Sequence, residues 1–318
     1  MYVAVYYYRA FVVVFSDTKQ GVLKMKNIIY LTGSNGSLGT GIQRYFIDNK
    51  IIPGKINILE YEQLKKEIVK SKANIIAHTA AIVGSSSCDA FGKYSHQVNV
   101  EGTKNIVEIA DKLDIKLIHF SSTAIYGKYS HEKTIEEDTS TIPDTLYART
   151  KYDSEYEVED LALEQQMIIR PTMIYHTNDA LTNQKSLNYA IKSTLNNEPQ
   201  IVLNLDPNTY KCYTHIEDFC NILEALITKN CWGEDFNISC GADKCKKVES
   251  IFNYIVDELE NITPNKTNII FRRDKDTLGH HIVSCKKAIN YSGVIPKYTI
   301  KEGIDEMIAH YKKLEKKK

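Results

Sequence analysis

The sequence has no excess of charge of either sign. Its 318 residues include 40 Lys and Arg against 40 Asp and Glu, so the formal net charge is zero. A strongly basic surface is the electrostatic signature of nucleic-acid binding and of attachment to anionic membranes. Because that signature is missing, we expect neither nucleic acid nor a membrane as a partner.

Long hydrophobic runs are also scarce. The most apolar stretch, residues 3–15, contains Arg9 and is shorter than the roughly 20 residues that cross a bilayer. It also lacks the basic leader and the cleavage pattern of a signal peptide. Because Met25 directly precedes the first strand pattern, we interpret residues 1–24 as an N-terminal extension of doubtful role. An additional strand, a segment foreign to the functional chain and a signal anchor stay open for it.

Cysteine and histidine are present without a metal-binding pattern. None of the seven cysteines forms a Cys-x2-Cys pair, and Cys240 and Cys245 have no histidine at zinc spacing. An odd, dispersed set of cysteines is typical of reduced thiols in a cytoplasmic protein. The adjacent His280 and His281 point in different directions on regular structure, so we expect surface or structural roles for them. We therefore predict a cytoplasmic location, no disulfide framework and no metal site.

What the sequence does contain is a regular alternation of strand and helix patterns. Apolar runs predict strands at residues 28–31, 74–78, 117–120 and 166–169, and helical spacing predicts helices at 38–48, 62–70, 100–113 and 147–165. This alternation favours an α/β fold with a doubly wound parallel sheet over residues 25–175. The less regular residues 176–318 indicate mainly a smaller lobe, with segments that return to the first domain.

A glycine-rich turn follows the first predicted strand. Gly33, Gly36 and Gly39 lie between that strand and a helix, which is the context of a dinucleotide-binding turn. The first glycine permits the tight turn, the second lets the backbone approach a pyrophosphate, and the third packs the helix on the strand. The free N–H groups of the helix N-terminus favour the phosphates. We therefore expect a dinucleotide cofactor at this turn.

The segment after the second predicted strand bears on the choice of cofactor. An acidic residue that would bind the ribose 2′-hydroxyl of NAD is not evident in residues 49–57, which carry Lys50 and Lys55 instead. Cations there would tolerate a 2′-phosphate, so NADP(H) is favoured and NAD(H) stays possible. The alternative interpretation is that both lysines are solvated surface residues.

Tyr147 and Lys151 form a candidate proton-transfer pair. They are four residues apart on a predicted helix and therefore share one face. A nearby cation favours the ionised form of a phenol, whose unperturbed pKa is near 10. Tyr147 could then exchange a proton with a carbonyl or alcohol near neutral pH. The pair alone is weak evidence, but it gains weight from the glycine turn and from Ser122, which lies between the two motifs.

These motifs resemble the extended short-chain dehydrogenase/reductase family of nucleotide-sugar epimerases, dehydratases and reductases. Further matches occur at residues 78–81, 99–103, 120–127, 170–171, 213–218, 236–238 and 297–303. The resemblance implies a Rossmann-type domain with a nicotinamide cofactor, a C-terminal substrate lobe and a nucleotide-sugar substrate. It also implies a homodimer formed through the helices at 100–113 and 147–165.

The resemblance assigns roles to individual residues. Ser122 would hydrogen-bond the substrate oxygen, Tyr147 would exchange a proton with it, and Lys151 would bind the nicotinamide ribose and lower the pKa of the tyrosine. Besides Tyr147 and Lys151, the cofactor would contact Gly33, Asn35, Gly36, Ser37, Leu38, Gly39, Asn57, Ile58, Ala80, Ala81 and Pro171. The substrate would contact Thr123, Met173, Lys211 and Arg273.

Departures from the family pattern narrow the reaction. Sugar dehydratases carry an Asp-Glu pair where this chain has Thr123 and Ala124, and GDP-fucose-synthase-type enzymes carry a cysteine at the latter position. Neither dehydration nor epimerisation through an enolate has its acid here. At two positions where family members bind the diphosphate of the nucleotide, Met173 replaces an asparagine and Lys211 replaces an arginine. These two replacements count against a nucleotide-sugar substrate. In its short second strand and its apolar residue at position 173, the chain resembles the dTDP-4-dehydrorhamnose reductases.

We therefore predict an NAD(P)H-dependent oxidoreductase that reduces the keto group of a nucleotide-linked 4-keto-6-deoxy sugar. An NAD-dependent nucleotide-sugar 4-epimerase is the first alternative, because it uses the same Ser, Tyr and Lys. A non-catalytic, regulatory NADP(H)-binding protein is the second. Relatives of that kind keep the glycine turn but tend to lose the Tyr or the Lys, whereas this chain has both.

Overall fold

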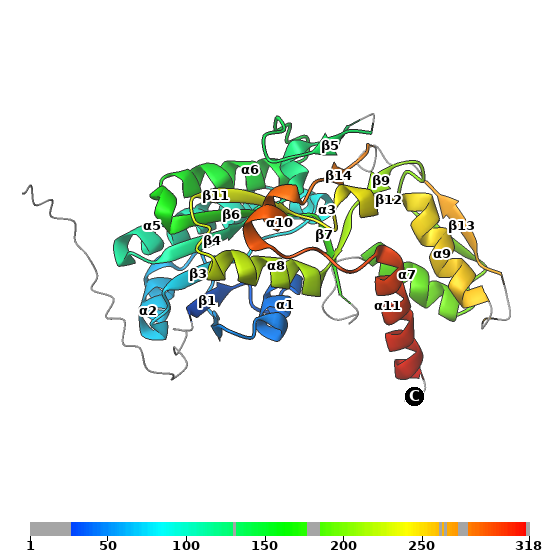
Figure 1. Ribbon diagram of the computed structural model, residues 1–318, viewed down its shortest axis with the longest axis horizontal. Helices are drawn as coiled ribbons and strands as arrows, with labels where there is room; N and C mark the ends of the chain where they lie inside the picture. Colours follow the sequence, from blue (N-terminus) through cyan, green and yellow to red (C-terminus); the bar gives the residue numbers. More distant parts are fainter. Residues whose placement is uncertain are drawn as a thin grey trace, which may run out of the picture.

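The computed structural model describes residues 27–129, 132–176, 185–260, 263, 266–272 and 279–315. The predicted extension at residues 1–24, Met25 and Arg273 lie outside the described residues. At the centre is a six-stranded parallel sheet (Figure 1). Its order is β11 (Glu234–Ile238), β6 (Gln166–Pro171), β4 (Lys116–Phe120), β3 (Ile75–His78), β1 (Ile28–Thr32) and β2 (Lys50–Pro53).

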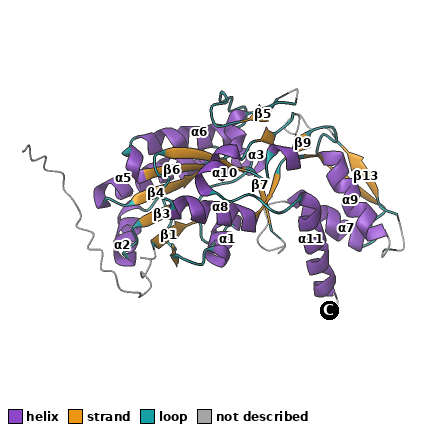
Figure 2. Ribbon diagram, viewed as in Figure 1, coloured by secondary structure: helices purple, strands orange, loops and turns teal. Residues whose placement is uncertain are grey.

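Helices cover both faces of this sheet (Figures 1 and 2). One face packs against α1 (Ser37–Tyr45), α8 (Ile216–Thr228) and α10 (Lys286–Ser292). The other packs against α2 (Tyr61–Ser71), α5 (Gly102–Leu113) and α6 (Leu146–Glu159). The predicted Rossmann-type α/β fold is confirmed.

Side-chain alternation along the strands explains the two layers. Successive residues of a strand point to opposite faces. In β1, Ile29 and Leu31 are buried against α1 and α8, whereas Tyr30 is buried against α2 and α5. Because both faces are covered, the strands carry the nearly continuous apolar runs from which they were predicted.

A second apolar cluster forms the smaller lobe. It contains α7 (Lys185–Leu195), α9 (Val248–Glu260) and α11 (Ile300–Glu315), with β8 (Gln200–Leu203) paired to β13 (Asn268–Phe271). Short strand pairs lie between this lobe and the main sheet: β7 (Met173–Tyr175) with β10 (Tyr213–His215), β9 (Tyr210–Lys211) with β12 (Lys246–Lys247), and β5 (Thr134–Ile135) with β14 (Ile282–Val283). Although α8 and β11 come late in the chain, they pack in the apolar core of the six-stranded sheet.

Two helix boundaries differ from the prediction. The helix expected over residues 147–165 ends at Glu159, because Leu161 turns into the apolar cluster below α6. The helix expected from residue 100 begins as the α-helix α5 only at Gly102, after a π-helical turn at Gln97–Glu101. None of the described helices combines the length and the apolar composition that crossing a bilayer requires.

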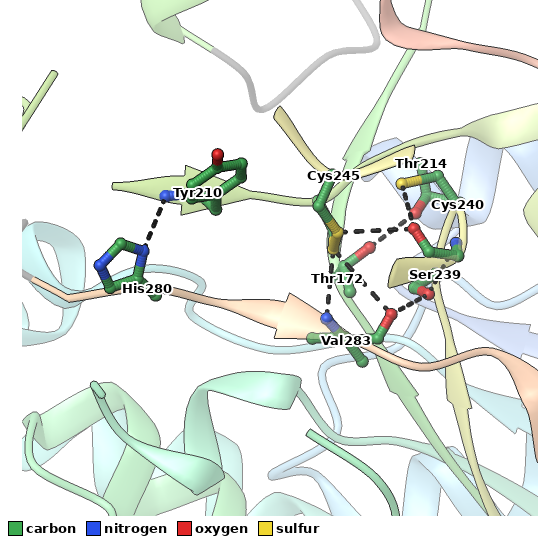
Figure 3. Close-up of a disulfide and its surroundings, with 10 residues drawn as sticks. Thr172, Tyr210, Thr214, Ser239, Cys240, Cys245, His280 and Val283 are labelled. Carbon is green, nitrogen blue, oxygen red and sulfur yellow. Dashed lines mark hydrogen bonds between the residues drawn. A yellow bond between two sulfur atoms is a disulfide. The ribbon is translucent and has the colours of Figure 1, made fainter. Parts of the chain in front are cut away.

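The structure joins Cys212 to Cys245 in a disulfide, so the prediction of reduced thiols is wrong for this pair. Lys211 in β9 faces Lys246 in β12 across an antiparallel ladder, which brings the next residues, Cys212 and Cys245, opposite each other with Cα atoms 4.4 Å apart. This pairing depends on two strands 33 residues apart, so no local spacing revealed it. Figure 3 shows the disulfide beside Cys240, Ser239 and Val283.

Cys240 lies close to this disulfide. The sulfur atoms of Cys212, Cys240 and Cys245 are within 4.8 Å of one another, and all three residues are buried. Metal binding by cysteine requires thiolates, and two of these three sulfurs are consumed by the disulfide. With the disulfide formed, the three cysteines are therefore part of the buried apolar packing.

The disulfide closes a loop of 33 residues, and a crosslink of that span stabilises the folded chain by about 3 to 4 kcal/mol in the loop-entropy picture. We therefore expect dithiothreitol to lower the free energy of unfolding of the wild-type protein in urea titrations by an amount of that order. In the double variant Cys212→Ala, Cys245→Ala the reductant should have no effect. Equal sensitivity of the two proteins to reductant would contradict the pairing.

Candidate active site

A cleft of about 1340 Å³ runs along the carboxyl ends of the central strands. Its walls come from the turn after β1, the loop after β2, and the segments that follow β3, β4 and β6. Ligands of open α/β sheets bind at this edge, beside the point where the strand order reverses. In this sheet the reversal falls between β1 and β3.

The predicted cofactor residues come together along one part of this cleft. Ten of them line it: Gly33, Asn35, Gly36, Ser37, Leu38, Asn57, Ile58, Ala80, Ala81 and Pro171. The remaining one, Gly39, lies beneath the glycine turn, where a Cβ would collide with Gly33 O and come within 2.8 Å of Ser34 Cα. It therefore supports the turn from below.

Gly33 is the sharpest constraint in the turn. Its φ of +64° lies in the left-handed region, and a Cβ there would come within 2.6 Å of the backbone N of Ala80. The turn after β1 and the segment after β3 can thus approach each other only because residue 33 is glycine. The result is an open cradle at the N-terminus of α1.

Two buried hydroxyls test whether this cradle fits a phosphate-bearing cofactor. Ser37 Oγ and Ser121 Oγ both belong to residues that line the cleft, and neither has a hydrogen-bond partner among the described residues. Burying a hydroxyl without a partner is costly. With the free N–H groups of the first turn of α1, Ser37 offers a bound phosphate the donors it needs, so the residues present fit a dinucleotide.

Ser122, Tyr147 and Lys151 line the same cleft. Ser122 caps the 3-10 helix Thr123–Tyr126, its Oγ accepting a hydrogen bond from Ala124 N at 3.1 Å, and it lies near enough to Tyr147 to affect the pKa of the phenol. Thr145 caps α6 by accepting from Ala148 N, which places Tyr147 in the first turn of that helix. One turn later Lys151 emerges on the same face.

Burial sets the protonation of this group. It raises the pKa of Tyr147 to about 12, although the hydrogen bond from Ser122 acts in the opposite direction. It also lowers the pKa of Lys151 to about 8, with Glu155 opposing the shift. The expected lowering of the Tyr147 pKa by Lys151 is therefore wrong for this structure: burial of the phenol raises its pKa, and Lys151 is not among the groups that shift it.

A buried ion pair supports Lys151 from below. Glu155, one turn further along α6, binds Arg170 of β6 through two hydrogen bonds of 2.8 and 3.0 Å. Arg170 also donates to Tyr126 and pairs with Asp235 of β11. The network ties α6 to the sheet and so positions the cleft-facing side chains of its first turns.

The predicted substrate residues are only partly brought together. Thr123 and Met173 line the cleft, but the Thr123 hydroxyl donates to Pro171 O at 3.2 Å. Lys211 is not among the lining residues; its Nζ donates to Gly279 O, and burial lowers its pKa to about 8. Arg273 lies outside the described residues. Ala124 also lines the cleft, and its methyl side chain brings no acidic group to it.

Among the lining residues outside the predicted site, Lys55 and His281 bear most directly on the chemistry. Lys55 lines the cofactor part of the cleft, and its neighbour Gly54 is packed against Tyr30. His281 lines the part next to Thr123, with its Nε2 3.0 Å from Thr123 O. Sequence reasoning treated His281 as surface or structural because its place depends on a strand bridge to Lys211, 70 residues earlier.

Several solved structures are similar to this chain over nearly its whole length. UDP-glucose 4-epimerase of Thermotoga maritima, with UDP-glucose, has a TM-score of 0.79 at 19% identity, over 90% of this chain and 99% of that one. dTDP-4-dehydrorhamnose reductase of Bacillus anthracis, with NADP, has 0.75 at 17%, over 90% and 98%. RMD of Pseudomonas aeruginosa, complexed with NADPH, has 0.79 at 16%, over 91% and 100%. At these identities the likeness establishes the fold.

The sequence itself decides the family. No curated protein sequence matches the chain. The family model described as "RmlD substrate binding domain", in contrast, matches residues 25–246, well over half of the chain. With the parallel sheet, the glycine turn and the Ser–Tyr–Lys arrangement in one cleft, this chain belongs to the RmlD substrate binding domain family, within the extended short-chain dehydrogenases/reductases.

Proposed function

We propose that this protein is an NADPH-dependent reductase that converts the keto group of a nucleotide-linked 4-keto-6-deoxy sugar to a hydroxyl. The observation that carries the proposal is the convergence of Ser122, Tyr147 and Lys151 on the cleft that also holds the glycine turn. Nucleotide-sugar enzymes and NADP-binding reductases among the structures of like fold support it.

The nicotinamide, when bound, supplies the hydride. Tyr147 acts as the acid: as the hydride reaches the carbonyl carbon, the phenol gives its proton to the carbonyl oxygen, and solvent later returns a proton to Tyr147. A pKa of about 12 keeps the phenol protonated at neutral pH, which suits the donor in a reduction. Ser122 hydrogen-bonds the same oxygen and aligns it with the phenol.

Lys151 stabilises the charge that forms on Tyr147. With a pKa of about 8, its ammonium is mostly protonated at neutral pH. It lies one helical turn from the phenol, so it favours the phenolate left after proton transfer. We expect the same ammonium to donate hydrogen bonds to the nicotinamide ribose.

The choice of NADPH rests on Lys55. Lys55 lines the cleft in the loop after β2, whereas Lys50 begins that strand, is exposed and is not a lining residue. No carboxylate of the described residues lines the cleft, so nothing there would repel a 2′-phosphate. A charge-assisted hydrogen bond from Lys55 would favour NADPH over NADH.

The cofactor assignment is tested by replacing the two lysines one at a time. Lys55→Ala should weaken binding of NADPH about tenfold or more while changing the dissociation constant for NADH little, because one charge-assisted hydrogen bond is lost only with the phosphorylated cofactor. Lys50→Ala is the matched control and should bind both as the wild type does. Equal losses for the two cofactors in Lys55→Ala would rule out the phosphate contact, as would tighter binding of NADH by the wild type.

The catalytic role of Tyr147 is tested by removing its hydroxyl. Tyr147→Phe should lower kcat for keto-sugar reduction by about 10² to 10⁴, the usual contribution of a positioned acid, while the dissociation constant for NADPH changes only a few-fold. Tyr152→Phe is the control, because that hydroxyl on the same helix bonds Tyr156 and is not in the cleft. Turnover of Tyr147→Phe at the wild-type rate would refute the assignment.

A 4-epimerase is the second candidate, because it would use the same three side chains and the structures of like fold include UDP-glucose 4-epimerases. An epimerase returns the hydride to its sugar and retains its NAD, so it has no net demand for NADPH. A regulatory binder would take up NADPH without oxidising it. Purified protein without bound NAD that consumes NADPH in proportion to the sugar supports the reductase over both.

We keep two further predictions as proposals. We propose a homodimer that forms through α5 and α6. Sedimentation equilibrium at micromolar concentration should give the mass of a dimer, and the mass of a monomer would contradict the proposal. We also propose a cytoplasmic location. Fractionation of the source cells should recover the protein in the cytoplasmic fraction, and recovery elsewhere would contradict the proposal.

A further inference from the structure

His281 occupies a defined place in the wall of the cleft. Its backbone N–H donates to Tyr210 O at 2.9 Å, and its backbone forms a bridge to Lys211 of β9, so the residue is fixed to the lobe by strand-like bonds. Its side chain reaches Thr123, the residue after Ser122, and lines the cleft together with Thr123, Ala124 and Met173.

The hydrogen bond to Thr123 determines which nitrogen carries the proton. A carbonyl oxygen can only accept, so Nε2, 3.0 Å from Thr123 O, must be the donor. Burial and the neighbouring Lys211 ammonium lower the pKa of His281 to about 4, so the ring is neutral at physiological pH. In a neutral ring protonated at Nε2, Nδ1 is an acceptor. No donor among the described residues hydrogen-bonds it.

Two threonine hydroxyls that line the same cleft already have hydrogen-bond partners. The Thr123 hydroxyl is engaged with Pro171 O, and the Thr172 hydroxyl is engaged with that of Thr214 at 2.6 Å. Ala124 and Met173 are apolar at the same end of the cleft. A sugar hydroxyl that leaves water for this end of the cleft needs an acceptor for its proton, because a buried hydroxyl without a partner is costly. The Nδ1 atom of His281 can be that acceptor.

We propose that Nδ1 of His281 accepts a hydrogen bond from a hydroxyl of the substrate sugar next to the carbon that is reduced, and so makes that hydroxyl a requirement for turnover. This inference rests on the proposed reductase function and narrows its substrate to keto sugars with a free vicinal hydroxyl. His281 fixes the orientation of the sugar, while the proton still comes from Tyr147. A site built to bond a hydroxyl discriminates strongly against an analogue that lacks it.

The test compares two substrates, the nucleotide-linked 4-keto-6-deoxy sugar with its vicinal hydroxyl at C3 and the corresponding 3-deoxy compound. The wild-type protein should prefer the hydroxylated sugar by about 10- to 100-fold in kcat/KM. His281→Leu should lose that preference, with the loss confined to the hydroxylated sugar and with NADPH affinity unchanged. His281→Asn, whose amide oxygen can replace Nδ1 as acceptor, should recover most of the preference.

His280→Asn is the matched control. The Nδ1 of His280 accepts a hydrogen bond from Tyr210 N at 3.3 Å, as Figure 3 shows, and His280 is not among the residues that line the cleft. This variant should behave as the wild type does. If His281→Leu slows both sugars equally, or neither, the inference is overturned while the reductase function stands. If the wild-type protein oxidises NADPH with neither sugar, the proposed function falls, and the inference falls with it.

Discussion

All the chemistry of this protein depends on the parallel pairing of the central strands. Because β1, β3, β4 and β6 run in the same direction, the residues that follow them meet at one edge of the sheet. A slip of one residue would turn the buried side chains to the opposite face, so burial on both faces holds the register. The close approach of Gly33 to Ala80 then joins two of these strand ends into one cradle.

The second organising effect is the exclusion of water from the side chains around the cleft. Burial keeps the Tyr147 phenol protonated and His281 uncharged at neutral pH. It also lowers the pKa of Lys151 to about 8. In the proposed mechanism, the same physical cause prepares Tyr147 as the acid, Lys151 as the cation beside it and His281 as the acceptor. The Glu155–Arg170 pair below α6 keeps the first two in place.

Features encoded by local pattern were predictable from the sequence, and features that depend on pairing between distant segments were not. Strand alternation, the glycine turn and the i, i+4 spacing of Tyr147 and Lys151 are local, and the structure has them where expected. The disulfide at Cys212, the position of Lys211 behind the cleft wall and the contact of His281 with Thr123 depend on how β9 meets β12 and the chain before β14. The expected lowering of the Tyr147 pKa was wrong, because a sequence pattern does not show that the phenol is buried and that burial raises its pKa.

The central claim is that this cleft moves hydride from NADPH to one carbon of a sugar. The most direct measurement supplies NADPH carrying deuterium at the transferred position, together with a nucleotide-linked 4-keto-6-deoxy sugar, and analyses the product by mass spectrometry and NMR. We expect one deuterium at C4 of each reduced sugar and one NADPH oxidised per sugar. A sugar that changes configuration without label and without loss of NADPH, or no change in either compound, would contradict it.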